Sequence, residues 1–516
     1  MSARWPVRFY LRFQVGDNTF VPGGRIFVPA CRRGGESRIF SGPADRLLFF
    51  GRLCDRHNLS APEKLERGLG LIEATSLNMT FMVGIGPFVV IPLMLQAVGG
   101  PQSLIAWLIG AGLALMDGCV WAELGAAMPQ AGGSYVFLRE GYGPGRWGRL
   151  MSFLYIWQTL FQGPLSVASG ALGFAGYSSY LVGRSKWLGA GLRPFGAHTD
   201  NVIAGAVVAL AVALLYRRIT TIGKISVAFC IVVVGTILWL ILGGVTHFQP
   251  ALLSFPPNAW NFSWVLLAGL GHATVQSVYS YLGYYNICNL GGEIKEPERN
   301  IPRAIFISII GVAILYFAIQ TSILGVLPWQ EAANTKAVVS LFVERVYGAR
   351  WALVATGLIL VTAFGSIFSA VLGYSRVPYA AALDGNFFSV FARVHATKRF
   401  PHISLLALGA TALIFCMLTL GQAIRGILAM RCLVQFVGQA LGLILLHRRW
   451  KADRWPFRMW FYPAPVAIAM AGWIGIFIAT GWTPVLASLA AAGIGILVYL
   501  GHSLYLRQWP FEEVTQ

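Results

Sequence analysis

Charged residues are scarce in this sequence: they make up 11% of its 516 amino acids, against 56% that are hydrophobic. Soluble proteins carry about 25% charged residues, so this scarcity excludes a soluble enzyme. A membrane crossing takes about 20 apolar residues, and the chain holds enough of them for about a dozen crossings. The 39 basic residues outnumber the 20 acidic ones, which fits either nucleic acid binding or the cytoplasmic loops of a membrane protein.

Cysteine motifs and catalytic motifs are also missing. The seven cysteines include no Cys-x-x-Cys pair and mostly fall inside apolar stretches. We interpret them as small core residues rather than disulfide partners or metal ligands. The sequence has no His-Glu-x-x-His motif and no nucleophile elbow, which disfavours a membrane enzyme. We therefore expect no catalytic residues, no cofactor and no metal.

The first 68 residues differ from the rest of the chain. They contain twelve Lys and Arg and no apolar run long enough for a signal peptide, so we predict that residues 1–68 form a disordered cytoplasmic tail. Alternatively, the residues up to about Leu59 precede the true start, because Ser60-Ala-Pro-Glu-Lys resembles a helix-capping entry to the segment that follows.

Twelve apolar stretches follow, separated by Gly, Pro or charge clusters, and each is typical of a membrane-spanning helix. The 59 glycines favour close packing between such helices. We predict an all-α membrane protein whose transporter domain occupies residues 69–506, with a short cytoplasmic tail at 507–516. The predicted spans are 69–95, 102–128, 149–180, 201–216, 224–245, 262–290, 304–327, 351–373, 404–421, 426–447, 462–481 and 483–506.

The distribution of Lys and Arg predicts the orientation of these spans. With the amino terminus inside, the tail and the inner connections hold 31 of the 39 basic residues, and the outer connections hold seven. Cytoplasmic loops of membrane proteins are enriched in Lys and Arg, so we predict two cytoplasmic termini in a plasma or inner membrane. The net charge of +19 then reflects topology in the lipid bilayer, and we expect no nucleic acid partner.

Two spans are interrupted near their middles. The first contains Gly84-Ile85-Gly86-Pro87, and the sixth contains a glycine among aromatic residues, in Tyr279-Ser-Tyr-Leu-Gly283-Tyr-Tyr-Asn286. Broken helices persist in membranes where they line a cavity, and the amides at a half-helix start attract a carboxylate. The alternatives are a plain packing kink at the glycines and an interfacial belt for the tyrosines, although belts lie at helix ends.

The two interruptions lie five helices apart, in corresponding positions of the segments 69–245 and 262–447. This spacing is the pattern expected of an inverted repeat with a central binding site. Three motifs accompany this pattern: Gly84-Ile-Gly-Pro-Phe, Ala122-Glu-Leu-Gly with Met128-Pro-Gln-Ala-Gly-Gly-Ser-Tyr135, and Gly292-Glu-Ile-Lys-Glu-Pro-Glu-Arg-Asn-Ile-Pro-Arg-Ala304. Together they resemble the amino acid-polyamine-organocation superfamily of permeases, and the segment from Tyr279 to Glu293 is most similar to its L-type amino acid transporter branch.

The resemblance implies a LeuT-like core of two inverted five-helix repeats, with two extra helices at 462–506, that moves amino acids by alternating access. It implies that the substrate carboxylate meets backbone amides around Gly84, Ile85 and Gly86. The substrate ammonium would meet carbonyls near Tyr279, Ser280 and Leu282, beside the break at Gly283, and the Tyr279 ring would act as a gate. Ile85 stands where many relatives have a hydroxyl residue, so backbone contacts alone are expected there.

Several polar residues inside the spans are candidates for ion coupling. Asp117, deep in the second span, and His272, in the sixth, are candidates for proton coupling; the alternatives are a carboxyl that stays protonated and a hydrogen-bonded core histidine. Ser366 and Ser369 would line a sodium site or bond their own backbone. Arg431 is predicted to lie toward the outer surface, where its side chain snorkels.

We predict a secondary amino acid transporter. An apolar and aromatic lining without a certain buried counter-charge favours neutral amino acids over polyamines or dicarboxylates. The alternatives are an amino acid sensor on a transporter scaffold and a permease for polyamines or cationic amino acids. Animal L-type members join a glycoprotein through an external cysteine, which the segment 181–200 lacks, so the resemblance implies no disulfide-linked heavy subunit.

Overall fold

The computed structural model describes residues 65–184, 198–505 and 509–511, except for 218, 257, 258, 262, 336 and 419. Within these ranges the chain is helical, and its β pairings are limited to two isolated bridges, Leu69 with Ile294 and Ala131 with Leu290. The prediction of an all-α protein is confirmed for this part of the chain. The predicted tail at 1–68 lies outside it up to residue 64.

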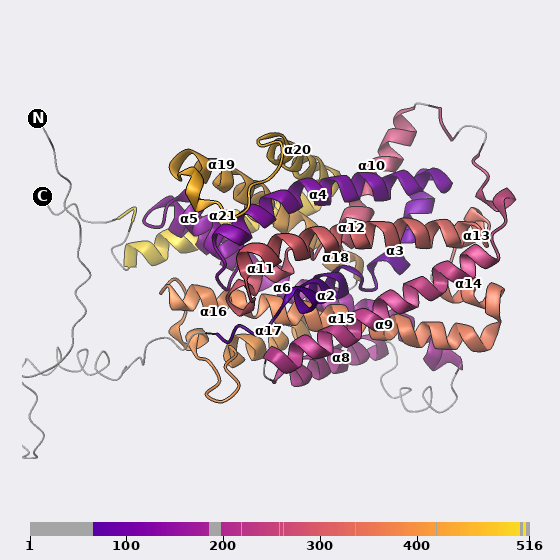
Figure 1. Cartoon of the computed structure of the whole chain (residues 1–516), viewed down its shortest axis with the longest axis horizontal. Helices are drawn as coiled ribbons and strands as arrows, with labels where there is room; N and C mark the ends of the chain where they lie inside the picture. Colours follow the sequence, from indigo (N-terminus) through magenta and orange to yellow (C-terminus); the bar gives the residue numbers. More distant parts are fainter. Residues whose placement is uncertain are drawn as a thin grey trace, which may run out of the picture. The chain divides into compact units, whose positions relative to one another are not determined.

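Six helices are longer than the others (Figure 1). They are α4 (Leu104–Ala127), α6 (Trp147–Arg184), α9 (Ile219–Thr246), α12 (Pro297–Leu324), α15 (Ala349–Tyr374) and α21 (Trp482–Tyr505). The shorter helices are α2 (Leu71–Met82), α3 (Gly86–Val98), α5 (Ser134–Tyr142), α8 (Thr199–Leu215), α10 (Trp264–Tyr281), α11 (Asn286–Asn289), α13 (Trp329–Ala333), α14 (Val338–Tyr347), α16 (Arg376–Leu383), α17 (His402–Phe415), α18 (Leu420–Arg431), α19 (Gln439–Arg449) and α20 (Ala464–Ala479).

Each of the twelve predicted spans overlaps at least one of these helices. By length and hydropathy, six helical segments of the described residues can cross a membrane, or seven if the bent pair α2 and α3 forms one span. The apolar helices α8, α17 and α20 are shorter. The positions of the predicted helices therefore agree with the structure, while twelve crossings in a LeuT-like arrangement stay a prediction.

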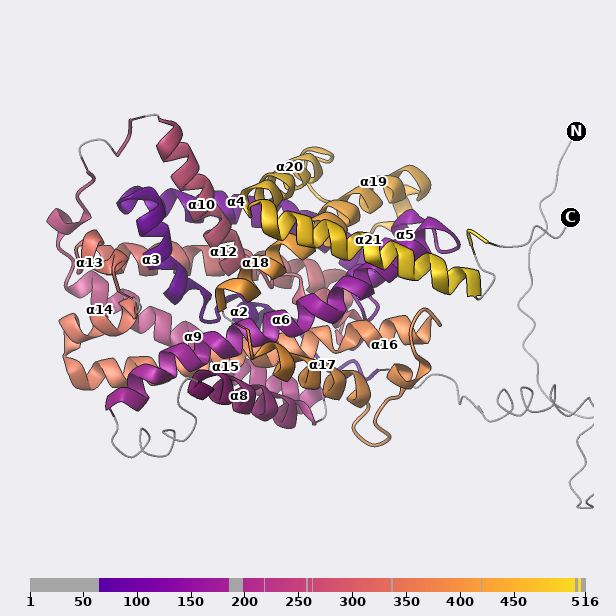
Figure 2. The same ribbon diagram turned by 180° about the vertical axis from the view of Figure 1, so that it is seen from behind.

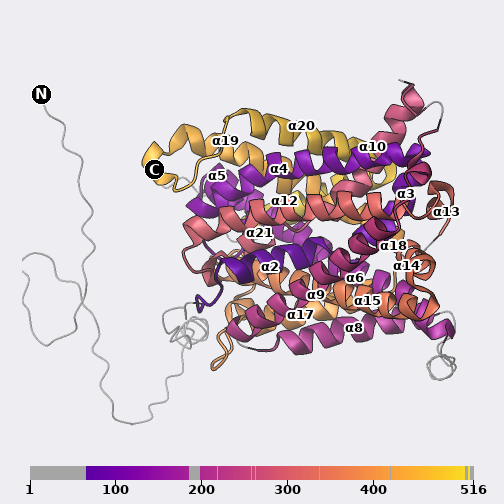
Figure 3. The same cartoon turned by 45° about the vertical axis from the view of Figure 1, so that its right-hand side comes forward.

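Glycines allow close contacts between helices, as the glycine content predicts. Helices α4 and α12 run side by side (Figures 1 and 3). A Cβ atom on Gly118 of α4 would lie 2.7 Å from Cδ1 of Ile309, and one on Gly125 would lie 2.8 Å from Cγ2 of Ile301. Larger side chains at these two positions would push the helices apart, so the glycines permit the packing.

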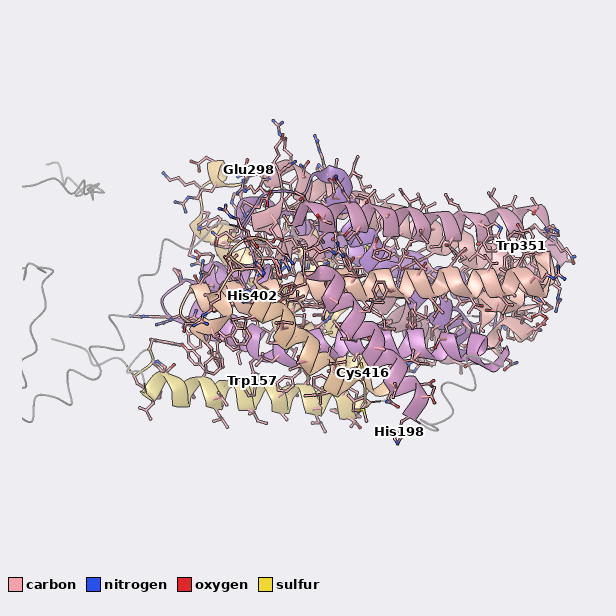
Figure 4. All side chains as sticks on the ribbon, turned by 90° about the horizontal axis from the view of Figure 1, so that it is seen from below. Trp157, His198, Glu298, Trp351, His402 and Cys416 are labelled. Carbon is pink, nitrogen blue, oxygen red and sulfur yellow. The ribbon has the colours of Figure 1, made fainter. Side chains whose placement is uncertain are left out.

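Helix α6 is the long element of the opposite face, where it packs against α8, α15, α17, α18 and α21 (Figure 2). Figure 4 shows Glu298 and His402, which belong to predicted inner helix ends, toward one end of the molecule. Trp351, at a predicted outer end, lies toward the opposite end. This distribution is the one expected when successive spans alternate in direction.

Candidate functional site

The first predicted interruption is a true break in the helix. Helix α2 ends at Met82 and α3 begins at Gly86, with a bend of 42° between them. Pro87 occupies the first turn of α3, where a missing N–H is tolerated and the ring favours a new helix start. The sequence Gly84-Ile85-Gly86-Pro87 therefore ends one helix and begins another within one predicted span.

The second predicted interruption is also a break. Helix α10 ends at Tyr281, and the chain turns through residues 282–285 before the short α11. Gly283 has a φ of +125°, a backbone conformation that residues with a Cβ rarely adopt. A Cβ atom there would lie 2.8 Å from Cδ1 of Phe81. The two breaks, about 200 residues apart in the sequence, therefore lie against each other.

An asparagine side chain satisfies backbone groups that the second break exposes. The Asn78 amide donates from Nδ2 to the carbonyl of Tyr284 at 2.6 Å, and its Oδ1 accepts the N–H of Ile287 at 3.0 Å. Buried backbone groups without partners are costly in a membrane. Asn78, on α2, therefore stabilises the second break and joins it to the helix that precedes the first.

Hydroxyl groups satisfy the carbonyls of the first break. Tyr316 donates to the carbonyl of Met82 at 2.7 Å and approaches that of Ser280 at 3.1 Å. Ser366 donates to the carbonyl of Phe81 at 3.0 Å. Ser366 thus bonds another helix rather than its own backbone, and helices α12 and α15 both hold the broken segments in place.

A cavity of about 60 Å³ opens where the breaks meet. Six of the seven residues predicted to contact the substrate line it, and the seventh, Gly283, is adjacent in sequence to one of them. The remaining lining comes from α2, α6, α15 and α18. The lining residues are Phe81, Met82, Gly84, Ile85, Gly86, Ser166, Ser169, Gly170, Tyr279, Ser280, Leu282, Ser366, Ile427 and Arg431.

The prediction that Arg431 lies toward the outer surface is wrong. Its side chain is 2% exposed and lines the cavity. Helix α18 begins at Leu420, six residues before the predicted span 426–447, and Arg431 is its last residue, so the count of 1.5 Å per residue was made along a span that was too short at its outer end. The overlooked signal was the arginine itself, because a charge within an apolar span is expensive and usually functional.

Neutral groups hold the Arg431 guanidinium. Nη1 donates to the hydroxyl of Tyr285 at 2.6 Å, and Nη2 donates to the hydroxyls of Tyr374, at 2.5 Å, and Ser166. The buried Nε has no hydrogen-bond partner. These contacts orient the guanidinium without neutralising its charge.

Asp117 and His272, the two candidates for proton coupling, lie outside the lining of the cavity. The Asp117 side chain is 1% exposed and accepts hydrogen bonds from the Tyr284 hydroxyl and, at 2.9 Å, from the Trp121 indole. Tyr284 belongs to the second break, so Asp117 contacts the broken segment directly. His272 is exposed on α10. A coupling role for either residue stays a prediction.

A buried ion pair lies just beyond the second break. Arg376 donates from Nη2 and Nε to the two carboxylate oxygens of Glu293, at 2.9 and 3.3 Å, and both side chains are at most 1% exposed. Burial raises the pKa of the Glu293 carboxyl, and the Arg376 guanidinium opposes this rise. The pair ties the connection after α11 to α16. Among the described residues, no group of three His, Cys, Asp or Glu is placed to hold a metal ion.

Comparison with known proteins identifies the family. A family model described as amino acid permease matches residues 69–499, which include both broken helices and every residue that lines the cavity. The chain belongs to the amino acid permease family. The members of this family are transporters rather than enzymes, and the apolar helices of the described residues are those of a multi-pass membrane protein. The resemblance to the amino acid-polyamine-organocation superfamily is confirmed.

Relatives of this permease transport different amino acids, as their names state. Cationic amino acid transporter 4 of Homo sapiens is 26% identical over 411 residues, which cover 77% of this permease and 63% of the human protein. Serine/threonine exchanger SteT of Bacillus subtilis is 27% identical over 450 residues, covering 84% and 95% of the two chains. Branched-chain amino acid permease BcaP of Bacillus subtilis is 22% identical over 453 residues, covering 86% and 94%.

Proposed function

We propose that this permease is a secondary transporter that moves neutral amino acids across a plasma or inner membrane by alternating access. Both termini are cytoplasmic in this proposal, and no disulfide-linked subunit takes part. One observation carries it: six residues predicted from two distant breaks as substrate contacts line a single cavity.

The two breaks supply complementary partial charges for an amino acid zwitterion. Helix α3 begins at Gly86 and its first amides carry partial positive charge, which suits the substrate carboxylate. Helix α10 ends at Tyr281 and its last carbonyls carry partial negative charge, which suits the ammonium. Gly84 and Ile85 would add backbone amides, and the Tyr279 ring would cover the bound substrate.

Alternating access in this proposal uses the predicted repeats 69–245 and 262–447, with the extra helices at 462–506 packed outside them. The broken helices belong to different repeats yet contact each other through Gly283 and Phe81. A movement of one repeat against the other would therefore reshape the cavity. The Glu293–Arg376 pair lies at the predicted cytoplasmic end and would hold that side closed.

The lining of the cavity supports a neutral side chain over a cationic one. Apolar side chains from Phe81, Met82 and Ile427 contribute to it, together with serine hydroxyls, and none of the lining residues carries a carboxylate. A lysine-like or polyamine substrate would bury its distal ammonium without a counter-charge, which is strongly unfavourable. We propose Asp117 rather than His272 as the residue that couples transport to protons, because Asp117 contacts the broken segment through Tyr284.

Uptake into proteoliposomes tests this function. The purified protein would be reconstituted and exposed to a panel of radiolabelled amino acids, with a proton gradient, a sodium gradient or internal substrate supplied in separate arms. We expect the proteoliposomes to take up at least one neutral amino acid faster than protein-free liposomes do. The condition that supports uptake shows whether transport is coupled to protons, to sodium or to exchange with internal substrate. Binding without uptake in every arm would favour a sensor, and the absence of both would refute the proposal.

A further inference from the structure

Arg431 gives the cavity a fixed positive charge. Arg431 lines the same cavity as Gly84, Gly86 and Tyr279. Only 2% of the residue is exposed to solvent. Its hydrogen-bond acceptors are hydroxyl groups of Tyr285, Tyr374 and Ser166, which carry no charge in their ordinary form.

The buried acidic side chains of the described residues are engaged elsewhere. Asp117 accepts hydrogen bonds from Tyr284 and Trp121, Glu123 contacts His447, and Glu293 pairs with Arg376. The ion pairs found in the described part of the chain do not include Arg431. A buried charge without a counter-ion is expensive in a membrane protein and marks a functional position.

The unused donor of Arg431 is a second sign of a missing partner. Buried polar atoms are normally hydrogen-bonded, yet the Arg431 Nε, which is buried, has no acceptor. A guanidinium presents five N–H donors in a planar fork that matches the two oxygens of a carboxylate. Nη1 and Nη2 use three of the five donors for the hydroxyl groups, which leaves the N–H of Nε and one N–H of Nη1 without a hydroxyl partner.

The cavity then presents three electrostatic elements. They are the positive start of α3 at Gly86, the negative end of α10 at Tyr281, and the positive guanidinium of Arg431. The first two match the carboxylate and the ammonium common to every amino acid. The third matches a second carboxylate, which only an amino acid with an acidic side chain supplies.

We propose that Arg431 binds the side-chain carboxylate of an acidic amino acid, so that the cavity accepts aspartate or glutamate beside neutral amino acids and rejects cationic ones. This inference rests on the proposed function and adds a substrate class to it. Arg431 is thus a specificity-determining residue: a neutral substrate leaves its charge unpaired, an acidic side chain pairs it, and a cationic side chain is repelled.

The test compares L-glutamate with L-glutamine, which has nearly the same shape and no side-chain charge, and with L-lysine. Binding to the purified full-length protein would be measured as the ligand-dependent rise in its melting temperature. We expect the wild-type protein to bind L-glutamate at least as tightly as L-glutamine, and L-lysine about tenfold more weakly or worse. In Arg431→Gln, the affinity for L-glutamate relative to L-glutamine should fall about tenfold or more, equivalent to about 1.4 kcal/mol.

A matched control is Arg345→Gln, which removes an arginine that pairs with Glu331 on α13 and does not line the cavity, and should keep the preference for L-glutamate over L-lysine. An unchanged glutamate-to-glutamine ratio in Arg431→Gln would overturn the inference. If Arg431→Gln does not fold, the affinities of the wild-type protein for L-glutamate and L-lysine test the inference. Equal affinities for these two amino acids would overturn it. Binding and uptake of L-glutamine without binding of L-glutamate would refute this inference alone, whereas failure of every amino acid would refute the proposed function.

Discussion

Replacing Gly283 by valine should abolish transport while leaving the protein in the membrane. The φ of +125° at this residue is a conformation that costs about 1–3 kcal/mol for a residue with a side chain. The added Cβ would also lie 2.8 Å from the Phe81 ring and 3.3 Å from the backbone nitrogen of Met82, and overpacking of this kind typically costs about 1–3 kcal/mol.

The two effects sum to about 2–6 kcal/mol, or about 30-fold and more in the population of the native site, because about 1.4 kcal/mol is a factor of ten. Both contacts of the new side chain belong to the first break, so the strain falls on the cavity itself. We therefore expect the initial rate of amino acid uptake in proteoliposomes to drop by at least about 30-fold.

Gly271→Val is the matched control. Gly271 lies in α10, the helix that ends just before Gly283, and a Cβ atom there would point into open space. This variant should transport at close to the wild-type rate. Equal amounts of folded protein in the liposomes would be established by size-exclusion chromatography before comparison. If Gly283→Val takes up amino acids at the wild-type rate when equal amounts of protein are compared, the role assigned to the second break is refuted.

Three further substitutions test other parts of the structure. Glu293→Gln leaves the buried Arg376 unpaired and should lower the free energy of unfolding by about 3–5 kcal/mol, measured as thermal stability in detergent; an unchanged melting temperature would contradict it. Asp117→Asn should remove the pH dependence of uptake, and a preserved dependence would exclude Asp117 from proton coupling. Ser366→Ala leaves the carbonyl of Phe81 without its donor and should destabilise the protein by about 1–3 kcal/mol; stability equal to wild type would argue against this contact.

The breaks in the helices could be predicted from the sequence because their causes are local. Glycine and proline weaken a helix wherever they occur, and Gly84-Ile85-Gly86-Pro87 and Gly283 therefore marked both sites. The hydropathy pattern likewise located the helices, because each must be apolar along its own length. These features depend on neighbouring residues and do not require knowledge of the rest of the fold.

The position of Arg431 could not be predicted in the same way. Its burial depends on hydroxyl groups of Ser166, Tyr285 and Tyr374, which come from three other segments of the chain. The chain after it continues as a π-helix, a form that the hydrophobic pattern of the sequence does not indicate. Asn78 is a similar case, because its partners lie more than 200 residues away. Such polar contacts between distant helices leave no periodic pattern in the sequence.

The central claim is that the cavity between the two breaks is the amino acid site. Substituted-cysteine labelling tests it directly: Ser169 lines the cavity, and Ser169→Cys would be treated with a thiol reagent with and without an amino acid that the protein transports, beside the unmodified chain. We predict that the transported amino acid slows labelling by about tenfold at saturation and that an amino acid that is not transported has no effect. Labelling at the same rate with and without the transported amino acid would contradict the claim.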